Sequence, residues 1–120
     1  MDGKVDVEIS REGEITVAAF KSGSISDVEG IAAAGRRIRE VIEEGRPKRL
    51  VFDFAEVRFF SSQVLGLLLD IRARLAKSQG DVVISGINPQ LHRVFKITNL
   101  DKLFRFFEDR ESALKAVSTD

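Results

Sequence analysis

The sequence contains no cysteine. This absence excludes disulfide bonds, thiolate metal sites and cysteine nucleophiles together, and it fits a reducing compartment, so the cytoplasm is the expected location. No apolar run approaches the ~18 residues that a helix needs to cross a bilayer, and the N-terminal stretch MDGKVDVEIS is polar and alternating. We therefore expect neither secretion nor membrane insertion.

An excess of charge of either sign is also missing, because 19 Lys and Arg side chains balance 19 Asp and Glu side chains. No global field would draw such a protein to nucleic acid or to an anionic membrane, so direct nucleic-acid binding is not expected. The 120 residues suffice for one domain, residues 1–120. Such a domain buries roughly two thirds of the surface that the unfolded chain exposes.

Motifs for catalysis and for cofactors are scarce. His92 is the only histidine, and no glycine-rich phosphate-binding motif occurs. We expect His92 on a solvated helix face, no metal, no cofactor, and a protein that is not an enzyme. Asp53 could be a phosphoaspartate at a strand end, but that chemistry needs Mg²⁺ held by an acidic pair after a first parallel strand. The chain begins with a hairpin instead, so we expect Asp53 on the open sheet face, paired with Lys48 or Arg49.

Hydrophobic periodicity predicts the first elements. Strict alternation over residues 4–10 and a run rich in β-branched residues over 14–20 predict a hairpin of two strands. Ser26 and Glu29 fit a capping box, in which each side chain satisfies a backbone N–H at a helix start. Gly45-Arg46-Pro47 supplies a stop for this helix. Its predicted apolar stripe consists of Val28, Ile31, Gly35, Ile38 and Ile42.

Strands and helices alternate through the rest of the chain. Residues 50–54 predict a third strand that is parallel to the second, since a helix separates them. The later predictions are a strand over 81–85, a helix over 89–97 capped by Asn88, a strand over 104–107, and a helix capped by Asp109. The order ββαβαβαβα indicates an α/β fold with a mixed, mostly parallel five-stranded sheet and helices mainly on one face. Core positions are expected at Val94, Phe95, Ile97, Leu100, Leu103 and Phe104.

The run from Phe59 to Ile71, FFSSQVLGLLLDI, is the most apolar part of the chain. It places Ser61 and Ser62 at a helix start, where four backbone N–H groups lack intrahelical partners. A serine hydroxyl could cap them and a phosphate could be held by them. The first two turns of this helix are apolar almost all round, so a neighbouring element covers them or they form part of a docking surface.

From Arg49 to about Leu114 the sequence resembles the STAS domain of bacterial anti-sigma-factor antagonists. The resemblance rests on LVFDF, FFSS, LGLLL, VVISG and ITNLDKLF. The family usually has Asp-Ser-Ser-Gly-Leu-Gly at the helix start, and the matching residues here are Ser61-Ser62-Gln63-Val64-Leu65-Gly66. Three of these six positions differ. The resemblance implies a STAS-type fold and carries the family's phosphate-accepting serine over to Ser62.

The resemblance also implies a function. It predicts a regulatory interaction module that binds an anti-sigma factor with serine kinase activity, is released by phosphorylation at Ser62, and is restored by a serine phosphatase; ATP would belong to the kinase. Arg58 is near enough in sequence to pair with a phosphate on Ser62, and Gly66 is expected to serve close packing. The alternative is an unphosphorylated STAS scaffold subunit of a signalling or lipid-transport assembly. The predicted docking surface is Arg58, Phe60, Ser61, Ser62, Gln63, Val64 and Leu65.

Overall fold

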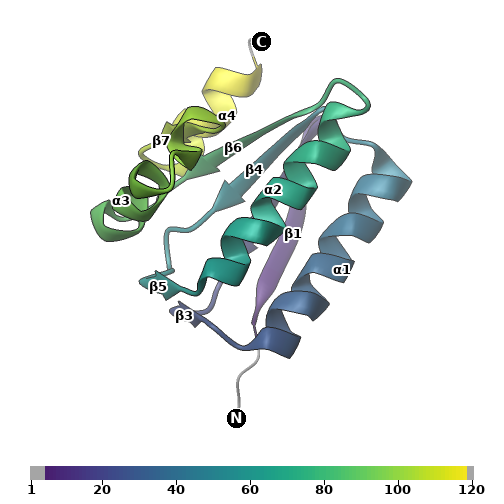
Figure 1. The fold of residues 1–120 in the computed structure, drawn as a ribbon. Helices are drawn as coiled ribbons and strands as arrows, with labels where there is room; N and C mark the ends of the chain where they lie inside the picture. The colour runs from purple at the N-terminus through teal and green to yellow at the C-terminus, as the bar shows by residue number, and fades with distance from the viewer. Residues whose placement is uncertain (1–4, 119–120) are drawn as a thin grey trace.

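The computed structural model describes residues 5–118. The strands form a five-stranded sheet of order β1-β2-β4-β6-β7 and a separate two-stranded ribbon of β3 and β5. Figure 1 shows this sheet with α1 and α2 lying across it. The strands are β1 Val7–Glu12, β2 Ile15–Phe20, β3 Ser24–Ile25, β4 Arg49–Asp53, β5 Phe59–Phe60, β6 Asp81–Ser85 and β7 Arg105–Phe107. The helices are α1 Val28–Gly45, α2 Ser62–Ala76, α3 Pro89–Ile97, α4 Arg110–Ser118 and the 3₁₀ helix η1 Leu100–Lys102.

The sheet has the predicted mixed pairing. Strands β1 and β2 form an antiparallel hairpin, and β2, β4, β6 and β7 run parallel to one another. The expected first strand began at Lys4, which lies outside the described residues. The α/β fold class predicted from the order of elements is confirmed.

Side chains along β4 point alternately to the two faces of the sheet, and each face carries its own hydrophobic core. Phe52 and Phe54 point to one face, where Phe54 stacks on Phe20 with ring centroids 5.3 Å apart. Helices α1, α2 and α3 contribute buried residues to this main core. Val51 points to the other face and packs with Val117 of α4. Three helices therefore cover one face and α4 covers the other, so the prediction that most helices share one face is confirmed.

The start of α1 differs from the predicted capping box. Asp27, not Ser26, is the N-cap, and its Oδ2 accepts a hydrogen bond from the Gly30 backbone N–H at 2.7 Å. The helix consequently begins one residue later, and the Val28 side chain turns toward solvent with 60% of its surface exposed. The rest of the predicted stripe is buried, and Ala34 joins it.

Helix α3 has the predicted bounds, because its start is encoded locally. The Asn88 side chain accepts from the Leu91 N–H at 2.8 Å, and Pro89 occupies the first turn. Phe95 is buried as predicted. Ile97 was also expected in the core, but it is 73% exposed at the helix C-terminus. Leu103 is 38% exposed and also lies outside the core, whereas Phe104 is buried.

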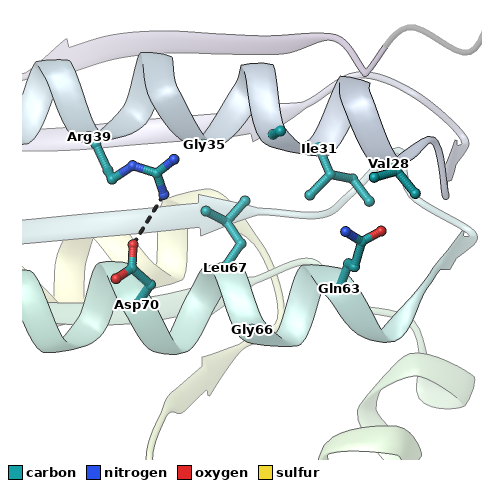
Figure 2. Close-up of a pocket in the computed structure, with 9 residues that line it drawn as sticks. Val28, Ile31, Gly35, Arg39, Gln63, Gly66, Leu67 and Asp70 are labelled. Carbon is teal, nitrogen blue, oxygen red and sulfur yellow. Dashed lines mark hydrogen bonds and ion pairs between the residues drawn. The ribbon is translucent and has the colours of Figure 1, made fainter.

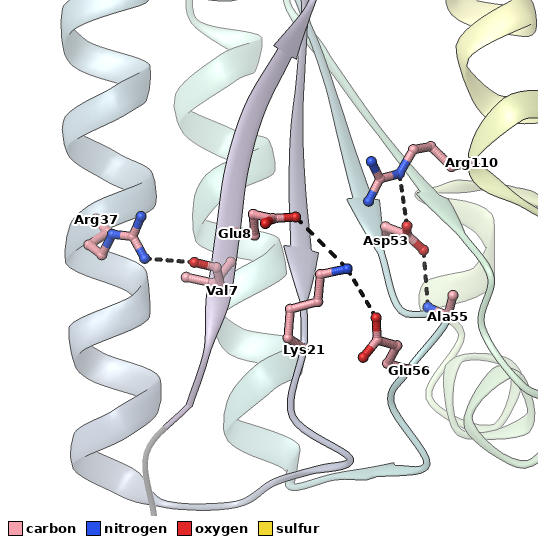
Figure 3. Close-up of polar contacts among 8 residues, drawn as sticks. All are labelled: Val7, Glu8, Lys21, Arg37, Asp53, Ala55, Glu56 and Arg110. Atoms are coloured by element: carbon pink, nitrogen blue, oxygen red, sulfur yellow. Dashed lines mark hydrogen bonds and ion pairs between the residues drawn. The ribbon is translucent and has the colours of Figure 1, made fainter.

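Two polar side chains have partners that differ from those expected. Asp53 is buried and accepts a hydrogen bond from Arg110 Nε of α4 at 3.0 Å and one from the Ala55 N–H at 3.0 Å, as Figure 3 shows. The expected pairing of Asp53 with Lys48 or Arg49 is wrong. His92 is half-buried rather than solvated, because its ring lies 4.3 Å from that of Phe106.

Candidate functional site

The short ribbon of β3 and β5 positions the N-terminus of α2. It is parallel, with Ser24 opposite Phe59 and Ile25 opposite Phe60. The Ser61 N–H continues this ribbon by donating to the Ile25 carbonyl at 2.9 Å. Figure 1 shows the ribbon at the end of the molecule where both α1 and α2 begin. The ribbon therefore holds the first residues of α2 next to the first residues of α1.

Asn88 also holds the segment that joins β4 to β5. Its Nδ2 donates to the carbonyls of Val57 and Arg58, each at 3.3 Å. The Arg58 N–H in turn donates to the Gly23 carbonyl at 2.8 Å. Hydrogen bonds from β3 and from Asn88 therefore hold the backbone that leads from β4 into α2 in a defined position.

The two serines have different surroundings. Ser61 is the N-cap residue, but its side chain forms no capping hydrogen bond, and its Oγ is buried without a hydrogen-bond partner. Ser62 is the first residue of α2 and its side chain is exposed. The expected hydroxyl cap is therefore absent at Ser61, while Ser62 lies at the surface. It lies at the positive end of the helix dipole, where a phosphate dianion is favoured.

Neighbouring phenylalanines of β5 point in opposite directions. Phe60 is 5% exposed and packs in the main core against Phe54 and Phe95, whereas Phe59 is 52% exposed. The predicted docking surface singled out Phe60 in the link from Arg58 to Phe60, but the exposed ring of this link is that of Phe59. Period-two alternation identifies one of the two as exposed, but only the pairing of β5 with β3 decides which one.

The predicted docking surface divides in the same way. Val64 and Leu65 are buried in the main core together with Phe60, so these three residues cannot contact a partner without a change in the fold. The apolar first turns of α2 are thus covered by the chain's own elements. The exposed members are Arg58, Ser62 and Gln63, with Ser61 half-buried. We call Arg58, Phe59, Ser62 and Gln63 the switch surface.

A groove between α1 and α2 begins at Gln63 (Figure 2). Its volume is about 290 Å³. Its walls include Val28, Ile31 and Leu67, and the Arg39–Asp70 ion pair at 3.1 Å crosses its other end. Apolar walls with one polar end are typical of a place where a side chain of another molecule can bind.

Gly66 opens this groove rather than serving close packing, so that prediction is wrong. A Cβ at Gly66 would meet no atom within 4 Å. The glycine that permits close approach of the two helices is Gly35, where a Cβ would lie 3.0 Å from Leu67 Cδ1. Sequence reasoning placed Gly35 on the buried stripe of α1 but did not identify its contact with α2.

Charges around the groove act on Asp70. Its partial burial would raise the pKa of the carboxyl, but hydrogen bonds and attraction from Arg74 and Arg39 outweigh burial and lower that pKa below its usual value. Among residues 5–118 no group of three or more acidic, histidine or cysteine side chains could hold a metal ion. None of the helices in the same range has the length and apolarity required to span a membrane.

Comparison with known proteins agrees with this architecture. The family model for the STAS domain matches residues 24–113. A putative anti-sigma factor antagonist, BtrV of Bordetella bronchiseptica, is 29% identical over 72 residues, which are 60% of this chain and 62% of that protein. The matched region thus spans less than two thirds of the length of that relative.

Solved structures share the whole fold. An anti-sigma factor antagonist from Mycobacterium paratuberculosis matches with a TM-score of 0.85 and 26% identity, over 98% of this chain and 97% of that chain. The anti-sigma factor antagonist SpoIIAA in its unphosphorylated form matches with a TM-score of 0.84 and 17% identity, over 96% and 98%. Its phosphorylated form, described for Bacillus, matches with a TM-score of 0.74 and 20% identity, over 93% and 99%. Since the family model covers most of the described residues and the fold agrees, the chain belongs to the STAS domain family.

Proposed function

We propose that this protein is a cytoplasmic anti-sigma-factor antagonist whose binding is switched by phosphorylation at Ser62. Its partner is an anti-sigma factor with serine kinase activity, and a serine phosphatase restores the binding form. The observation that carries the proposal is the exposed Ser62 hydroxyl at the N-terminus of α2, on a backbone held by β3 and Asn88. Similar proteins support the proposal, because several are described as anti-sigma factor antagonists and one of them was solved in a phosphorylated form.

The switch surface explains why a phosphate would release the partner. Phe59 offers a large exposed aromatic ring, and Gln63 offers hydrogen-bonding groups beside Ser62. Aromatic anchors surrounded by polar groups are typical of protein interfaces. A phosphate adds about −1.5 to −2 charges. A partner would have to remove the water around that dianion or oppose it with an unpaired charge, so affinity falls.

The test is to incubate the protein with the cognate anti-sigma kinase and ATP and to map the modified residue by mass spectrometry. We expect phosphate on Ser62 and none in a Ser62→Ala variant. Ser61→Ala is the matched control and should remain a substrate, because the Ser61 hydroxyl is buried. Phosphate on a different residue would overturn the assignment to Ser62, and no modification would favour an unphosphorylated scaffold of the STAS type.

A second measurement addresses binding. A Ser62→Asp variant should bind the anti-sigma factor at least about tenfold more weakly than the parent, which corresponds to ~1.4 kcal/mol. Ser112→Asp, an exposed serine on α4, supplies the same added charge on another element and should leave the affinity unchanged. Equal affinities of Ser62→Asp and the parent would contradict the switch.

A further inference from the structure

The corner formed by α3 and η1 has a surface that the proposed switch does not use. Ile97, at the end of α3, is 73% exposed and Leu103, after η1, is 38% exposed. Large aliphatic side chains are seldom left in water without a function when they gather at one place. Within residues 5–118, the other two large apolar side chains with high exposure are Val28, at the groove, and Phe59, on the switch surface.

Three cationic residues lie on the same two packed elements, α3 and η1, as these aliphatic residues. Arg93, Lys96 and Lys102 are exposed, and none of them forms an ion pair with another residue of the described range 5–118. Arg93, Lys96 and Ile97 share one face of α3, because they are spaced by three and four residues. Asp101 is the only acidic residue from 89 to 103. The corner is thus locally basic in a chain whose net charge is zero.

Several hydrogen bonds hold the backbone of the corner. The Thr98 hydroxyl and the Asn99 N–H donate to carbonyls of the last turn of α3, at 2.8 and 3.1 Å, so Lys96 is not needed as a cap. Arg72 Nε of α2 donates to the Leu103 carbonyl at 3.0 Å. A surface with this much fixed backbone loses little conformational freedom when it binds a partner.

We propose that Arg93, Lys96, Ile97, Lys102 and Leu103 form a second docking surface, for an acidic segment of a partner protein that carries apolar side chains. The positive charges and the exposed aliphatic side chains of these five residues are complementary to glutamates or aspartates that flank leucine-like anchors. This surface is independent of Ser62.

A membrane and a nucleic acid fit the corner less well. The apolar face of α3 is already used by the core through Leu91 and Phe95, so the helix has no apolar face to lay into a bilayer. Single-stranded nucleic acid is bound by exposed aromatic rings, whereas His92 and Phe106 are half-buried and packed ring to ring, and Phe95 and Phe104 are buried.

The experiment uses the full chain and a synthetic amphipathic helical peptide built of glutamate and leucine. Binding is followed by calorimetry and by amide chemical-shift changes. We expect shift changes centred on residues 93–103, and a Lys96→Glu/Lys102→Glu variant should bind about tenfold more weakly, since each exposed ion pair contributes little and two are reversed. Ile97→Ser should bind several-fold more weakly. Ser62→Asp should bind the peptide like the parent, which separates this proposal from the switch.

Matched controls decide the outcome. Lys77→Glu/Lys115→Glu reverses two exposed lysines elsewhere, and Val28→Ser removes an apolar side chain of similar exposure. Both should bind the peptide as the parent does. Equal loss in the control and corner variants, or no shift changes at 93–103, would overturn the proposal. Binding to vesicles of phosphatidylglycerol and phosphatidylcholine without binding to the peptide would also overturn it and point to a lipid surface.

Discussion

At the scale of the residue, adjacent side chains of β5 have opposite roles. Phe60 completes an aromatic cluster with Phe54 and Phe95 in the main core, and Phe59 meets solvent. The reason is the two-residue period of a strand, which sends successive side chains to opposite faces. One residue therefore contributes to the stability of the fold and its neighbour is available to a partner.

Substitution of these two phenylalanines should separate stability from binding. Phe60→Ala is expected to lower the free energy of unfolding by about 3–5 kcal/mol, because it leaves a cavity in the core. Phe59→Ala should lower the free energy of unfolding by less than about 1 kcal/mol, since half of that side chain is already exposed. The same substitution should weaken binding of the anti-sigma factor. Urea denaturation and calorimetry measure the two effects, and a large loss of stability in Phe59→Ala would contradict this assignment.

Two glycines make a second contrast. Gly66 lies in the interior of α2 with open space where a Cβ would be, so Gly66→Ala should raise the free energy of unfolding by about 0.5–1 kcal/mol through helix propensity. Gly86 has φ of +72° and a Cβ there would lie 3.0 Å from the Ala55 backbone. Gly86→Ala should therefore destabilise by about 1–2 kcal/mol or more. Thermal unfolding tests both, and a stabilised Gly86→Ala protein would refute the steric argument.

The residues that sequence reasoning placed correctly are those whose partners are near in the chain. Asn88 and Pro89 define the start of α3 within four residues, and Asp109 caps α4 through the Ser112 N–H at 2.8 Å. Asp53 was assigned the wrong partner because Arg110 is 57 positions away. Composition and periodicity carry no information about such distant pairs, which only the packing of α4 on the sheet creates.

At the scale of the element, the same limit explains why the β3–β5 ribbon could not be predicted. Each of its strands has two residues, Ser24–Ile25 and Phe59–Phe60, which is too short for a hydrophobic period. The ribbon exists because the loops before α1 and before α2 meet at the same end of parallel strands. The STAS resemblance located the site at the start of α2, but the orientation of Phe59 and Phe60 depends on this ribbon.

The pairing of α1 with α2 should depend on pH through Asp70. This carboxylate bonds Arg39 of α1 and Arg74 of α2, both at 3.1 Å, and its pKa is lower in the folded protein than in the unfolded chain. Because the folded-state pKa is lowered, the Asp70 carboxylate stabilises the folded protein at pH values above the unfolded-state pKa of ~3.9. This contribution is lost as the pH falls through the folded-state pKa. Acidification should therefore weaken the pairing of these two helices.

The measurement is the free energy of unfolding of the parent and Asp70→Asn from neutral to strongly acidic pH. We expect Asp70→Asn to be less stable at neutral pH and to approach the parent under acid conditions, so that its curve is flatter. The difference will be small because the Asp70 side chain is partly exposed. Glu40→Gln, an exposed position on α1, is the control and should parallel the parent. A difference that grows with acidity would contradict the assignment.

At the scale of the whole molecule, the proposed switch would act on a surface and leave the fold intact. The main core lies between the sheet and helices α1 to α3, and the Ser62 hydroxyl is outside it. The chain carries no net charge, so an added phosphate of about −2 does not increase an existing repulsion. Under the proposed switch, partner release would need no unfolding, and a phosphatase could reverse it without refolding.

The stability of the modified protein tests this view directly. A charge at the start of α2 interacts favourably with the helix dipole, by about 0.3–1 kcal/mol, so Ser62→Asp and the phosphorylated protein should unfold at the same temperature as the parent or higher. Thr98→Asp supplies the opposite case, because it puts the charge at the C-terminus of α3 and removes the hydroxyl bond to Val94. That variant should lose about 1 kcal/mol or more. A marked fall in the unfolding temperature of phosphorylated protein would mean that phosphate loosens the fold, and release would then follow from disorder rather than from a charged docking surface.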